Sequence, residues 1–578
     1  MERKSYVEKL KDKGQIILFL VFVLGVFHNC KFFGNVIWPQ METEFMAHHM
    51  PKLVAAIALG APIFLFKRFS VWYALILSLF IDVWIIANFI YFRCNGVLLN
   101  SIAISMVGNM EGFWNSVFLF MTPKVDVIPF LVTILTIVPL FFITGNKFMP
   151  RTFICVILCL YPLALWSHHS DVEKRGYWDS SIKYEPDNLY KVFSLTECES
   201  FEGRNDMFNL FDVDPSYNSV IHLLIDDLRL LRCVKESCEN INMPPEDEQR
   251  LLNVGITRGL KEGTKYNTKL VVLLMESMEC WALSPESMPN LWNFIQTHNH
   301  FRAARVKSQI RQGASSDGQM ILNTGLLPLK QGAACYLFPN STYPSLCKLT
   351  DNKSICIVPH SLTVWNQLGM SRAYAYTDNY CMGGDDKDLF AKLNQLIEED
   401  EYQVIQLITL STHANFESVS GLSDLQLPAD MPVYSQNFLK SFNYVDKYLG
   451  TFLAKIDSSE AFKNVTFIIT GDHTIFPHDK RMEMKQYSLS HNDVYNPESY
   501  VNAIIYSPNL DRTIVVEDEA YQMDLYPTIT AVLGAGFANY KGVGVNLLDS
   551  VARTNRILSH DEALDLSDKI IRSDFFKQ

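Results

Sequence analysis

Long apolar runs dominate the chain up to about residue 168, and they restrict its fold more than any other feature of the sequence. A helix that spans a membrane needs roughly 20 mostly apolar residues. We expect five such spans, at Gly14–Trp38, Pro51–Phe66, Ser70–Phe92, Val127–Thr144 and Pro150–Ser167. The first is not a cleavable signal peptide, because further spans follow it and no small-residue cleavage site does. Residues 1–168 are therefore predicted to form a transmembrane domain.

One more segment, Ile102–Met121, is amphipathic rather than uniformly apolar. Its methionines and aromatic residues recur at helical spacing, while Asn109, Glu111 and Asn115 interrupt the run. Such a helix is expected to lie in the membrane interface rather than across the bilayer. Counting it as a sixth span would move the rest of the chain to the other side of the membrane.

Basic residues predict the orientation. Five of them lie in the N-terminal stretch MERKSYVEKLKDKG, and others separate neighbouring spans at Lys67–Arg68, Lys147 and Arg151. Short loops rich in Lys and Arg remain in the cytoplasm. With five spans, the N-terminus lies inside the cell and everything after Ser167 lies outside, as in a multi-pass protein of the cell (inner) membrane.

The composition changes after residue 168 to that of a soluble acidic protein. The whole chain has 50 Lys and Arg against 62 Asp and Glu, a net charge of -12. This balance argues against nucleic acid as a partner, because nucleic-acid-binding surfaces are basic. We divide this part into a juxtamembrane connector (169–264), a catalytic domain (265–550) and a C-terminal tail (551–578).

Four short apolar runs after Tyr266 predict buried strands. They are KLVVLLM (269–275), VIQLITL (404–410), VTFIIT (465–470) and AIIYSP (503–508). Between them, FLKSFNYVDKYLGTFLAKI carries a single apolar stripe at helical spacing. Strands buried on both faces that alternate with helices indicate an α/β domain with a largely parallel sheet.

Polar side chains follow three of these predicted strands. Glu276 follows the first, His413 follows the run at 404–410, and Asp472 and His473 follow the run at 465–470. Because sites in open α/β sheets lie at the carboxyl ends of the strands, we expect these side chains to converge. An oxygen-rich set with one nitrogen suits Mn²⁺, Mg²⁺ or Zn²⁺.

Ser315 and Ser316 precede an apolar helical run in SQIRQGASSDGQMILNTGLLPL, residues 308–329. On their own they are good helix N-cap residues. A metal ion at the strand ends would also activate a coordinated serine oxygen as a nucleophile. A helix N-terminus favours a phosphoryl anion, so the roles of cap and nucleophile are compatible for Ser315. Ser316 is expected to be a cap or a donor to phosphate.

Six blocks of sequence carry a resemblance to a known family. They are MES (275–277), QGASSD (312–317) with LLPL (326–329), PHSLTVWN (359–366), ITLSTH (408–413), ITGDH (469–473) and QMDLYPTI (522–529). In this order, and after five predicted spans, they resemble the lipoteichoic acid synthase group of the alkaline phosphatase/sulfatase superfamily. The resemblance implies an extracytoplasmic domain of that fold and a phosphoglycerol transferase activity.

The resemblance also implies roles for individual residues. Glu276, Asp472 and His473 would bind a divalent metal, with Mn²⁺ favoured, and Ser315 would complete the site as the nucleophile. Ser315 stands where the family usually has threonine. His413 would contact the phosphoryl group.

Three further residues would lie at the substrate pocket: His360, Trp365 and Gln367. Gln367 stands where the family usually has an arginine that grips the lipid-derived group. The donor would be a membrane phospholipid, phosphatidylglycerol or phosphatidylethanolamine, and the acceptor a cell-surface glycan or lipid.

Three alternatives remain from the sequence. A phosphoethanolamine transferase fits the change at Gln367. A sulfatase-type hydrolase would need a C/S-x-P-x-R block, whereas Ser315 is followed by Ser316 and Asp317. A non-catalytic sensor would be expected to lack one of the ligands or the nucleophile, and this chain has all four.

Other acidic, histidine and cysteine residues leave further possibilities. His478, Asp479 and His491 could form a second metal or acid site, and Glu279 could be an extra ligand or, more simply, a surface acid. Disulfides are possible in an oxidising compartment, although their pairing cannot be derived from sequence. The cysteines in the outer part are Cys198, Cys233, Cys238, Cys280, Cys335, Cys347, Cys356 and Cys381.

Overall fold

The computed structural model describes ten stretches of the chain. They are residues 14–37, 50–66, 69–95, 121–142, 240–260, 263–330, 332–476, 478–491, 495–536 and 540–577. The chain divides into two compact units. In the described residues, the first unit holds the apolar N-terminal helices and the second holds an α/β domain.

Three helices of the N-terminal unit are long and apolar enough to cross a membrane: Gly14–Val36, Ser70–Tyr91 and Pro123–Phe141. They belong to α2 (Gly14–Ile37), to α4 (Ser70–Asn95), and to the consecutive helices α7 (Pro123–Asp126), α8 (Ile128–Ile137) and η5 (Val138–Phe142). The protein is therefore membrane-anchored.

The expected second span is shorter than its apolar run. It forms α3 (Met50–Gly60), which has 11 residues and continues as the short 3-10 helix η2 (Ala61–Phe64). The expected fifth span, Pro150–Ser167, and the expected interfacial helix, Ile102–Met121, lie outside the described residues. The count of five spans accordingly remains a prediction.

Polar contacts connect the described apolar helices. Asn29 Nδ2 of α2 donates to Asp82 Oδ1 of α4 at 2.8 Å and to the Pro129 carbonyl of α8 at 3.3 Å. Arg93 and Asp126 form a two-pronged ion pair at 2.9 and 3.0 Å. Polar groups in membrane helices normally pair with one another, because lipid offers no hydrogen bonds.

The second unit is built on one mixed sheet with the strand order β4-β3-β5-β1-β6-β7-β2-β8, and β9 pairs with β2. The strands are β1 (Lys269–Met275), β2 (His300–Lys307), β3 (Ser354–Val358), β4 (Asp378–Cys381), β5 (Val404–Ile408), β6 (Val465–Gly471), β7 (Val501–Tyr506), β8 (Ile514–Val516) and β9 (Ala520–Tyr521). All four predicted strands are present. Among the described strands, β7 alone runs against the rest, since it is antiparallel to both β6 and β2.

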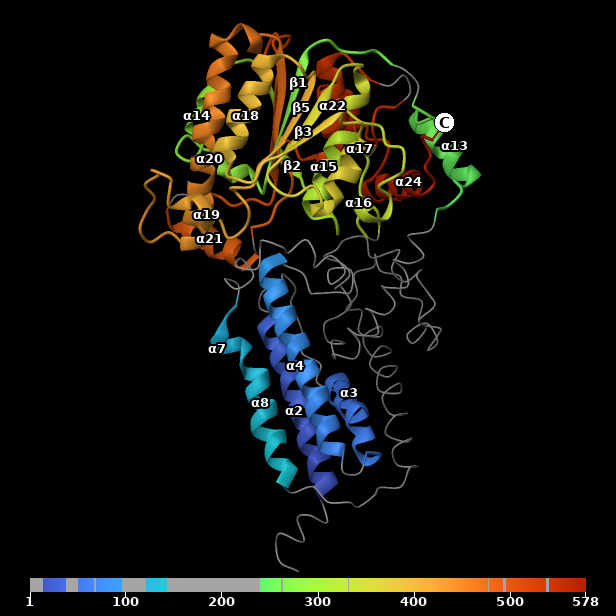
Figure 1. Ribbon diagram of the computed structural model, residues 1–578, viewed down its shortest axis with the longest axis vertical. Helices are drawn as coiled ribbons and strands as arrows, with labels where there is room; N and C mark the ends of the chain where they lie inside the picture. The colour runs from blue at the N-terminus through green and yellow to red at the C-terminus, as the bar shows by residue number, and fades with distance from the viewer. Residues whose placement is uncertain are drawn as a thin grey trace, which may run out of the picture. The chain divides into compact units, whose positions relative to one another are not determined.

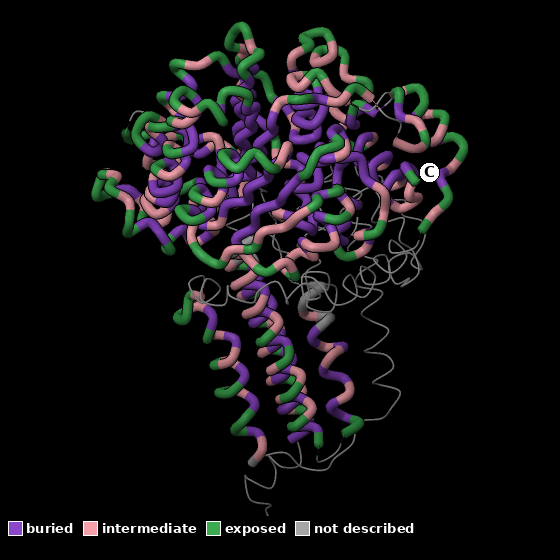
Figure 2. Tube along the Cα trace, turned by 45° about the horizontal axis from the view of Figure 1, so that its top comes forward, coloured by how far each residue is buried: buried purple, intermediate pink, exposed green. Residues whose placement is uncertain are grey.

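Helices cover both faces of the sheet (Figure 1). One face carries α14 (Pro289–Thr297), α18 (Asp386–Glu399) and α20 (Val433–Ser458). The other carries α15 (Ala314–Thr324), α17 (Gln367–Ala373) and α22 (Leu525–Leu533), with α16 (Ala334–Leu337) beside α17. The central strands β1, β5 and β6 are buried along their whole length (Figure 2), which explains their nearly continuous apolar sequences.

Each face of the sheet has its own hydrophobic core. The predicted stripe of α20 is buried in one of them, and its members are Phe438, Phe442, Val445, Leu449, Phe452 and Ile456. Three further helices are α19 (Glu417–Ser420), α21 (His478–Ser490) and α23 (Ser550–Thr554). The prediction of an α/β domain with a largely parallel sheet is confirmed.

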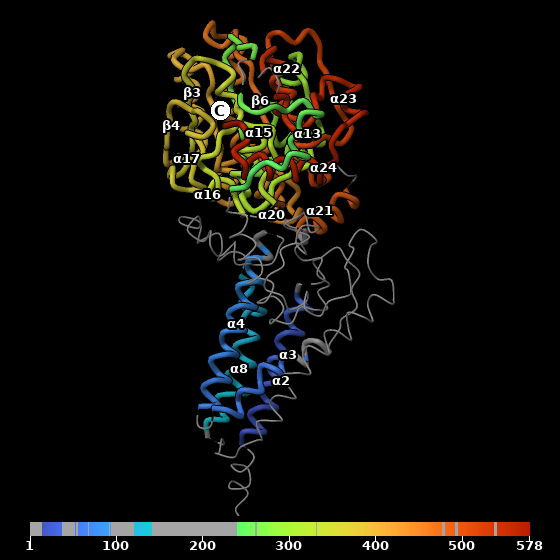
Figure 3. Tube along the Cα trace, turned by 90° about the vertical axis from the view of Figure 1, so that its right-hand side faces the viewer, coloured from blue at the N-terminus to red at the C-terminus, as the bar shows by residue number. Residues whose placement is uncertain are grey.

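The domain extends beyond residues 265–550 at both ends. Helix α13 (Pro245–Val254), from the expected connector, lies beside α24 (His560–Arg572), from the expected tail (Figures 1 and 3). Lys569 Nζ donates to Asp247 Oδ2 at 2.7 Å, and Leu566 and Ile570 of α24 are buried in the core. The last residues are thus a packed helix rather than a tail.

Candidate active site

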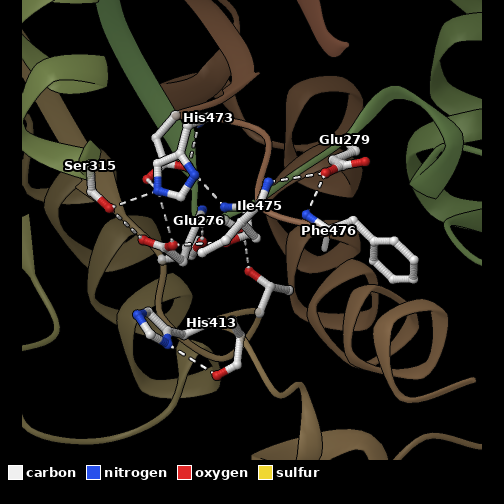
Figure 4. A network of polar contacts seen from close by, with 12 residues as sticks. Glu276, Glu279, Ser315, His413, His473, Ile475 and Phe476 are labelled. Carbon is white, nitrogen blue, oxygen red and sulfur yellow. Dashed lines mark hydrogen bonds and ion pairs between the residues drawn. The ribbon is translucent and has the colours of Figure 1, made fainter. Parts of the chain in front are cut away.

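The carboxyl ends of the central strands bring the predicted ligands together. Glu276 directly follows β1, and Asp472 and His473 directly follow the neighbouring parallel strand β6. Their ligand atoms all lie within 4.8 Å of one another, and all three side chains are buried (Figure 4). The parallel pairing of β1 with β6 is what makes residues from distant parts of the sequence neighbours.

Ser315 reaches the same place from the start of α15. Its Oγ lies 3.1 Å from His473 Nε2 and 3.3 Å from Glu276 Oε2. The preceding residue, Ala314, has a φ of 42°, a conformation that non-glycine residues adopt rarely and mostly where function or packing demands it. The turn before the helix therefore presents the hydroxyl to the ligand cluster.

The expected capping roles of Ser315 and Ser316 are wrong. The N-cap of α15 is Gly313, and no side chain caps the helix. Instead, the buried Asp317 folds back, and its Oδ2 accepts hydrogen bonds from the backbone N–H groups of Arg311 and Gly313 at 2.9 Å each. The turn is thus held from inside the helix, which leaves Ser315 directed at Glu276 and His473.

A glycine allows α15 to approach the loop after β6 that carries Asp472 and His473, called the ligand loop below. A Cβ atom on Gly318 would overlap the carbonyl oxygen of Asp472 and would lie 3.1 Å from its Cα. The same carbonyl accepts a hydrogen bond from Gln522 Nε2 at 2.7 Å. Gln522 begins the block QMDLYPTI, and the sequence alone did not assign it a role.

Hydrogen bonds also orient the two candidate carboxylate ligands. Asp472 Oδ1 accepts from the N–H groups of Ser277 and His473, both at 2.8 Å. Glu276 Oε1 accepts from Ser277 Oγ at 2.8 Å, and the Glu276 backbone is held by Thr409 and Thr412, which follow β5. The two carboxylates are therefore oriented before any ligand binds.

The remaining atoms of this cluster fit a divalent cation. Asp472 Oδ2 is buried and accepts no hydrogen bond, and it lies 3.3 Å from His473 Nε2. Burial and the Glu276 carboxylate raise the pKa of Asp472 to about 7, because two buried carboxylates repel each other without a cation. Burial alone would lower the pKa of His473, but Asp472 and Glu276 raise it. Two carboxylates, one imidazole and a hydroxyl suit Mn²⁺, Mg²⁺ or Zn²⁺.

His413 lies below this cluster in Figure 4, on the loop after β5. Its Nδ1 lies 3.2 Å from the Ala414 carbonyl, which can only accept, so this contact requires the proton on Nδ1. Burial lowers the pKa of His413, and the nearby His473 adds to this. Burial also lowers the pKa of His360, with a smaller contribution from His413. Both imidazoles are therefore predominantly neutral at pH 7.

The two other predicted pocket residues differ in exposure. Trp365 is half-buried, packs near Tyr336 with ring centroids 6.1 Å apart, and has a φ of 50°. Gln367 is buried, and its Nε2 donates to Ser371 Oγ at 3.2 Å and Cys356 Sγ at 3.5 Å. The Gln367 amide is therefore engaged by the core of the domain.

Glu279 is not a surface acid. It is fully buried, and its carboxylate pairs with both terminal nitrogens of Arg481 at 2.8 and 2.9 Å. The sequence contains no signal for this pair, because the two residues are 202 positions apart and lie in different elements.

The two histidines at the ends of α21 are too far apart to share one metal ion, and the side chains of His478 and Asp479 lie outside the part of the chain that the structure describes. His478 begins this 13-residue helix and His491 follows its end, so at about 1.5 Å per residue they are about 20 Å apart. His491 Nε2 instead lies 3.2 Å from Asp430 Oδ2. Among the side chains that the structure describes, Glu276, Asp472 and His473 are the one group placed to hold a metal ion.

The described cysteines of the α/β domain form no disulfide. They are Cys280, Cys335, Cys347, Cys356 and Cys381. Burial raises the pKa of four of these thiols to about 12, so they are neutral packing groups. Cys198, Cys233 and Cys238 lie outside the described residues.

Two family models match this chain. Residues 4–181 match the lipoteichoic acid synthase N-terminal domain, and residues 343–535 match the sulfatase family. A lipoteichoic acid synthase of Staphylococcus saprophyticus is 22% identical over 584 aligned positions, which cover 93% of this chain and 85% of that protein. Lipoteichoic acid synthase 2 of Bacillus subtilis is also 22% identical, over 52% of this chain and 50% of its own length.

Solved structures give weaker likenesses. The lipoteichoic acid synthase LtaP of Listeria monocytogenes is 16% identical with a TM-score of 0.45, over 52% of this chain and 81% of that one. The phosphoglycerol transferase GacH of Streptococcus pyogenes is 14% identical with a TM-score of 0.42, over 58% of this chain and 95% of that one.

The matches of both family models fall on the two units that the structure separates, one on the apolar helices and one on the α/β domain. The alignment with the staphylococcal protein joins them along nearly the whole chain. The superfamily to which the sulfatase match belongs consists of enzymes that generally depend on divalent metals, in keeping with the cluster at the strand ends. Together, these matches support a lipoteichoic acid synthase-like member of the alkaline phosphatase/sulfatase superfamily.

Proposed function

We propose that this protein is a membrane-anchored, metal-dependent phosphotransferase that moves the phosphoglycerol head group of a phospholipid to a cell-surface glycan or lipid. The observation that carries the proposal is the position of Ser315 Oγ, between Glu276 Oε2 and His473 Nε2. A hydroxyl that lies within 3.3 Å of two candidate metal ligands is placed to complete the metal site and to act as a nucleophile. Two relatives that align with the chain are named as lipoteichoic acid synthases.

Glu276, Asp472, His473 and Ser315 would hold the ion, for which Mn²⁺ is our first choice and Zn²⁺ or Mg²⁺ the alternatives. When bound, such an ion lowers the pKa of a coordinated hydroxyl and offsets charge on phosphoryl oxygens. The rigid hydrogen bonding of both carboxylates supports this role, because it holds the ligand atoms in place without the ion.

The first step would form a covalent phosphoserine. Ser315 Oγ attacks the phosphorus of the head group, a new P–O bond forms, and the bond to the diacylglycerol oxygen breaks. Ser315 Oγ gives up its proton and the leaving oxygen takes up one, so diacylglycerol departs as an alcohol. The start of α15 favours the phosphoryl anion next to Ser315, because the backbone N–H groups there carry partial positive charge.

The second step would return the serine. A hydroxyl of the acceptor attacks the phosphorus, the bond to Ser315 Oγ breaks, and Ser315 Oγ takes up a proton to become a hydroxyl again. Neutral His413, with its proton on Nδ1, can accept the proton of the acceptor hydroxyl at Nε2. His360 and Trp365, from the segment after β3, would line the path of the head group.

The donor is proposed to be phosphatidylglycerol. A headgroup-labelled competition assay on the full chain in detergent, with phosphatidylglycerol and phosphatidylethanolamine, tests this choice. We expect diacylglycerol release from phosphatidylglycerol, and no release by Asp472→Ala. Consumption of phosphatidylethanolamine alone would make the protein a phosphoethanolamine transferase instead.

The site is proposed to lie outside the cytoplasm, with the N-terminus inside and five spans between them. A reporter fused after Gln578 should then be active only outside the cytoplasm. Activity inside would mean an even number of spans and would contradict the proposed access to outer-leaflet lipid.

A further inference from the structure

The buried Glu279 carboxylate connects the two loops that carry the metal ligands. It lies three residues after Glu276, on the loop that follows β1. Its Oε1 accepts hydrogen bonds from the backbone N–H groups of Ile475 at 3.0 Å and Phe476 at 2.8 Å. These two residues lie just after His473 on the loop that follows β6, as Figure 4 shows.

Arg481 completes this connection from α21. Its guanidinium pairs with both carboxylate oxygens of Glu279, and it also donates to the carbonyl oxygens of Phe476 at 3.2 Å and Pro497 at 2.8 Å. The Trp281 indole N–H donates to Glu279 Oε2 at 3.0 Å. Five donors therefore surround one carboxylate, which leaves no lone pair directed at a metal ion.

The aromatic side chains of these loops pack together on α20. Trp281 stacks on Phe438 with ring centroids 4.3 Å apart, and Phe476 meets Trp281 edge-on at 5.1 Å. Phe416, three residues after His413, meets Phe438 at 5.0 Å. The ionic pair is therefore shielded by apolar rings, and the loops that carry the predicted site residues share one support.

We propose that Glu279 and Arg481 are a positioning pair, which fixes the loop of Asp472 and His473 against the loop of Glu276 and so sets the affinity of the metal site. The inference rests on the proposed metal-dependent function, and it adds residues that do not touch metal or substrate. Its physical basis is that a buried, fully hydrogen-bonded ion pair is rigid, while its single members are costly when unpaired.

Metal affinity is the property that separates this role from a general contribution to folding. Groups that orient metal ligands typically change metal affinity by about 10- to 100-fold when they are removed. We expect Arg481→Met and Glu279→Gln each to weaken Mn²⁺ binding within that range. The measurement is a titration of the full chain in detergent with MnCl₂. Binding is monitored as the loss of the electron paramagnetic resonance signal of aqueous Mn²⁺.

Asp446→Asn is the matched control. Asp446 is also buried and also accepts hydrogen bonds from two consecutive backbone N–H groups, those of Asn290 and Leu291, but between α20 and α14. Asp446→Asn should lower the free energy of unfolding. It should leave Mn²⁺ affinity within about twofold of wild type, well below the tenfold effect of a positioning group.

The double variant Glu279→Gln/Arg481→Met is less prone to misfold than either single variant, because it leaves no unpaired charge in the interior. It should fold and still bind Mn²⁺ about tenfold more weakly. In the metal-free protein, amide hydrogen exchange at Ile475 and Phe476 should be faster in this variant than in wild type, while exchange in β1 is unchanged.

Wild-type affinity in the double variant, with unaltered exchange at 475–476, would overturn the inference and leave the proposed function standing. Failure of the wild-type protein to bind Mn²⁺, Mg²⁺ or Zn²⁺ would overturn the proposed function, and the inference with it.

Discussion

Ser315 Oγ lies 3.1 Å from His473 Nε2, although the two residues are 158 positions apart in the sequence. One comes from the first turn of α15 and the other from the loop after β6. The contact depends on how closely the helix approaches the loop, and Gly318 controls that distance because its missing side chain faces the carbonyl of Asp472. The geometry of the active site can therefore be tested through residues that do no chemistry.

Gly318→Ala should lower turnover at least about tenfold, which corresponds to about 1.4 kcal/mol in the activation barrier. The added Cβ would overlap the Asp472 carbonyl oxygen, so α15 or the ligand loop must shift and separate Ser315 from His473. Alanine is a better helix former than glycine by up to about 1 kcal/mol, so a weakened helix cannot explain the loss. The measurement is the rate of diacylglycerol release by the full chain.

Gly421→Ala is the control for this substitution, because a Cβ atom at Gly421 meets nothing within 4 Å. It should keep the turnover of the wild-type protein. Equal turnover in Gly318→Ala and Gly421→Ala would show that the close approach of α15 to the ligand loop is unimportant.

Asp472→Ala should remove both bound metal and turnover. Asp472 Oδ2 is buried and accepts no hydrogen bond, so a bound cation would supply the partner that this oxygen lacks. Metal analysis of the purified full chain gives the result directly. If the residue had a purely structural role, the variant would lose stability and keep its metal, and full metal occupancy in Asp472→Ala would remove it from the ligand set.

Gln367→Arg should destabilise the α/β domain without changing the donor. Gln367 is buried against Cys356 and Ser371, so an arginine there would place an unpaired charge in the core, at a cost of at least ~2 kcal/mol. Thermal unfolding should show a lower midpoint than for Gln395→Arg, a change at an exposed glutamine of α18. A switch in donor preference with unchanged stability would instead place position 367 in the substrate pocket.

Asp386 should make stability depend on pH. Its carboxylate accepts hydrogen bonds from Leu410 and Ser411 on the loop that leads to His413, and burial raises its pKa to about 7. An unfolded aspartate titrates near 3.9, so the folded state binds the extra proton between these values. The stability that this provides is complete below about pH 4 and is lost as the pH rises through about 7.

Asp386→Asn removes this titration. The melting temperature of the variant relative to wild type should therefore be higher at about pH 8 than at about pH 5. Asp388→Asn, at an exposed position of the same helix, is the control for the loss of one negative charge from α18. A constant difference between Asp386→Asn and wild type across this range would mean that Asp386 stays ionised in the folded protein.

The sequence predicted the strands, and the approach of Glu276 to Asp472 and His473 at the strand ends, because both follow from local pattern. The run KLVVLLM became β1 over the predicted residues, and strand order then brought Glu276 next to Asp472 and His473. The apolar stripe of α20 was equally visible, since burial of one helix face leaves a periodic trace.

Contacts between distant segments leave no periodic pattern in the sequence. The partner of Glu279 is Arg481, and neither the pair nor its burial follows from any spacing. The start of α15 is fixed by Asp317, whose hydrogen bonds to the preceding turn replace the expected serine caps. The reversed direction of β7 and the packing of α24 likewise depend on tertiary structure rather than on local pattern.

The most direct test of the proposed mechanism is to identify the covalent intermediate. Full-length protein is incubated with phosphatidylglycerol in the absence of acceptor, and the peptide containing residues 308–329 is analysed by mass spectrometry. We predict glycerophosphate on Ser315, none in Ser315→Ala, and substantial activity in Ser315→Thr, which retains the attacking oxygen. Diacylglycerol release by Ser315→Ala at the wild-type rate, or glycerophosphate on another residue, would contradict the mechanism.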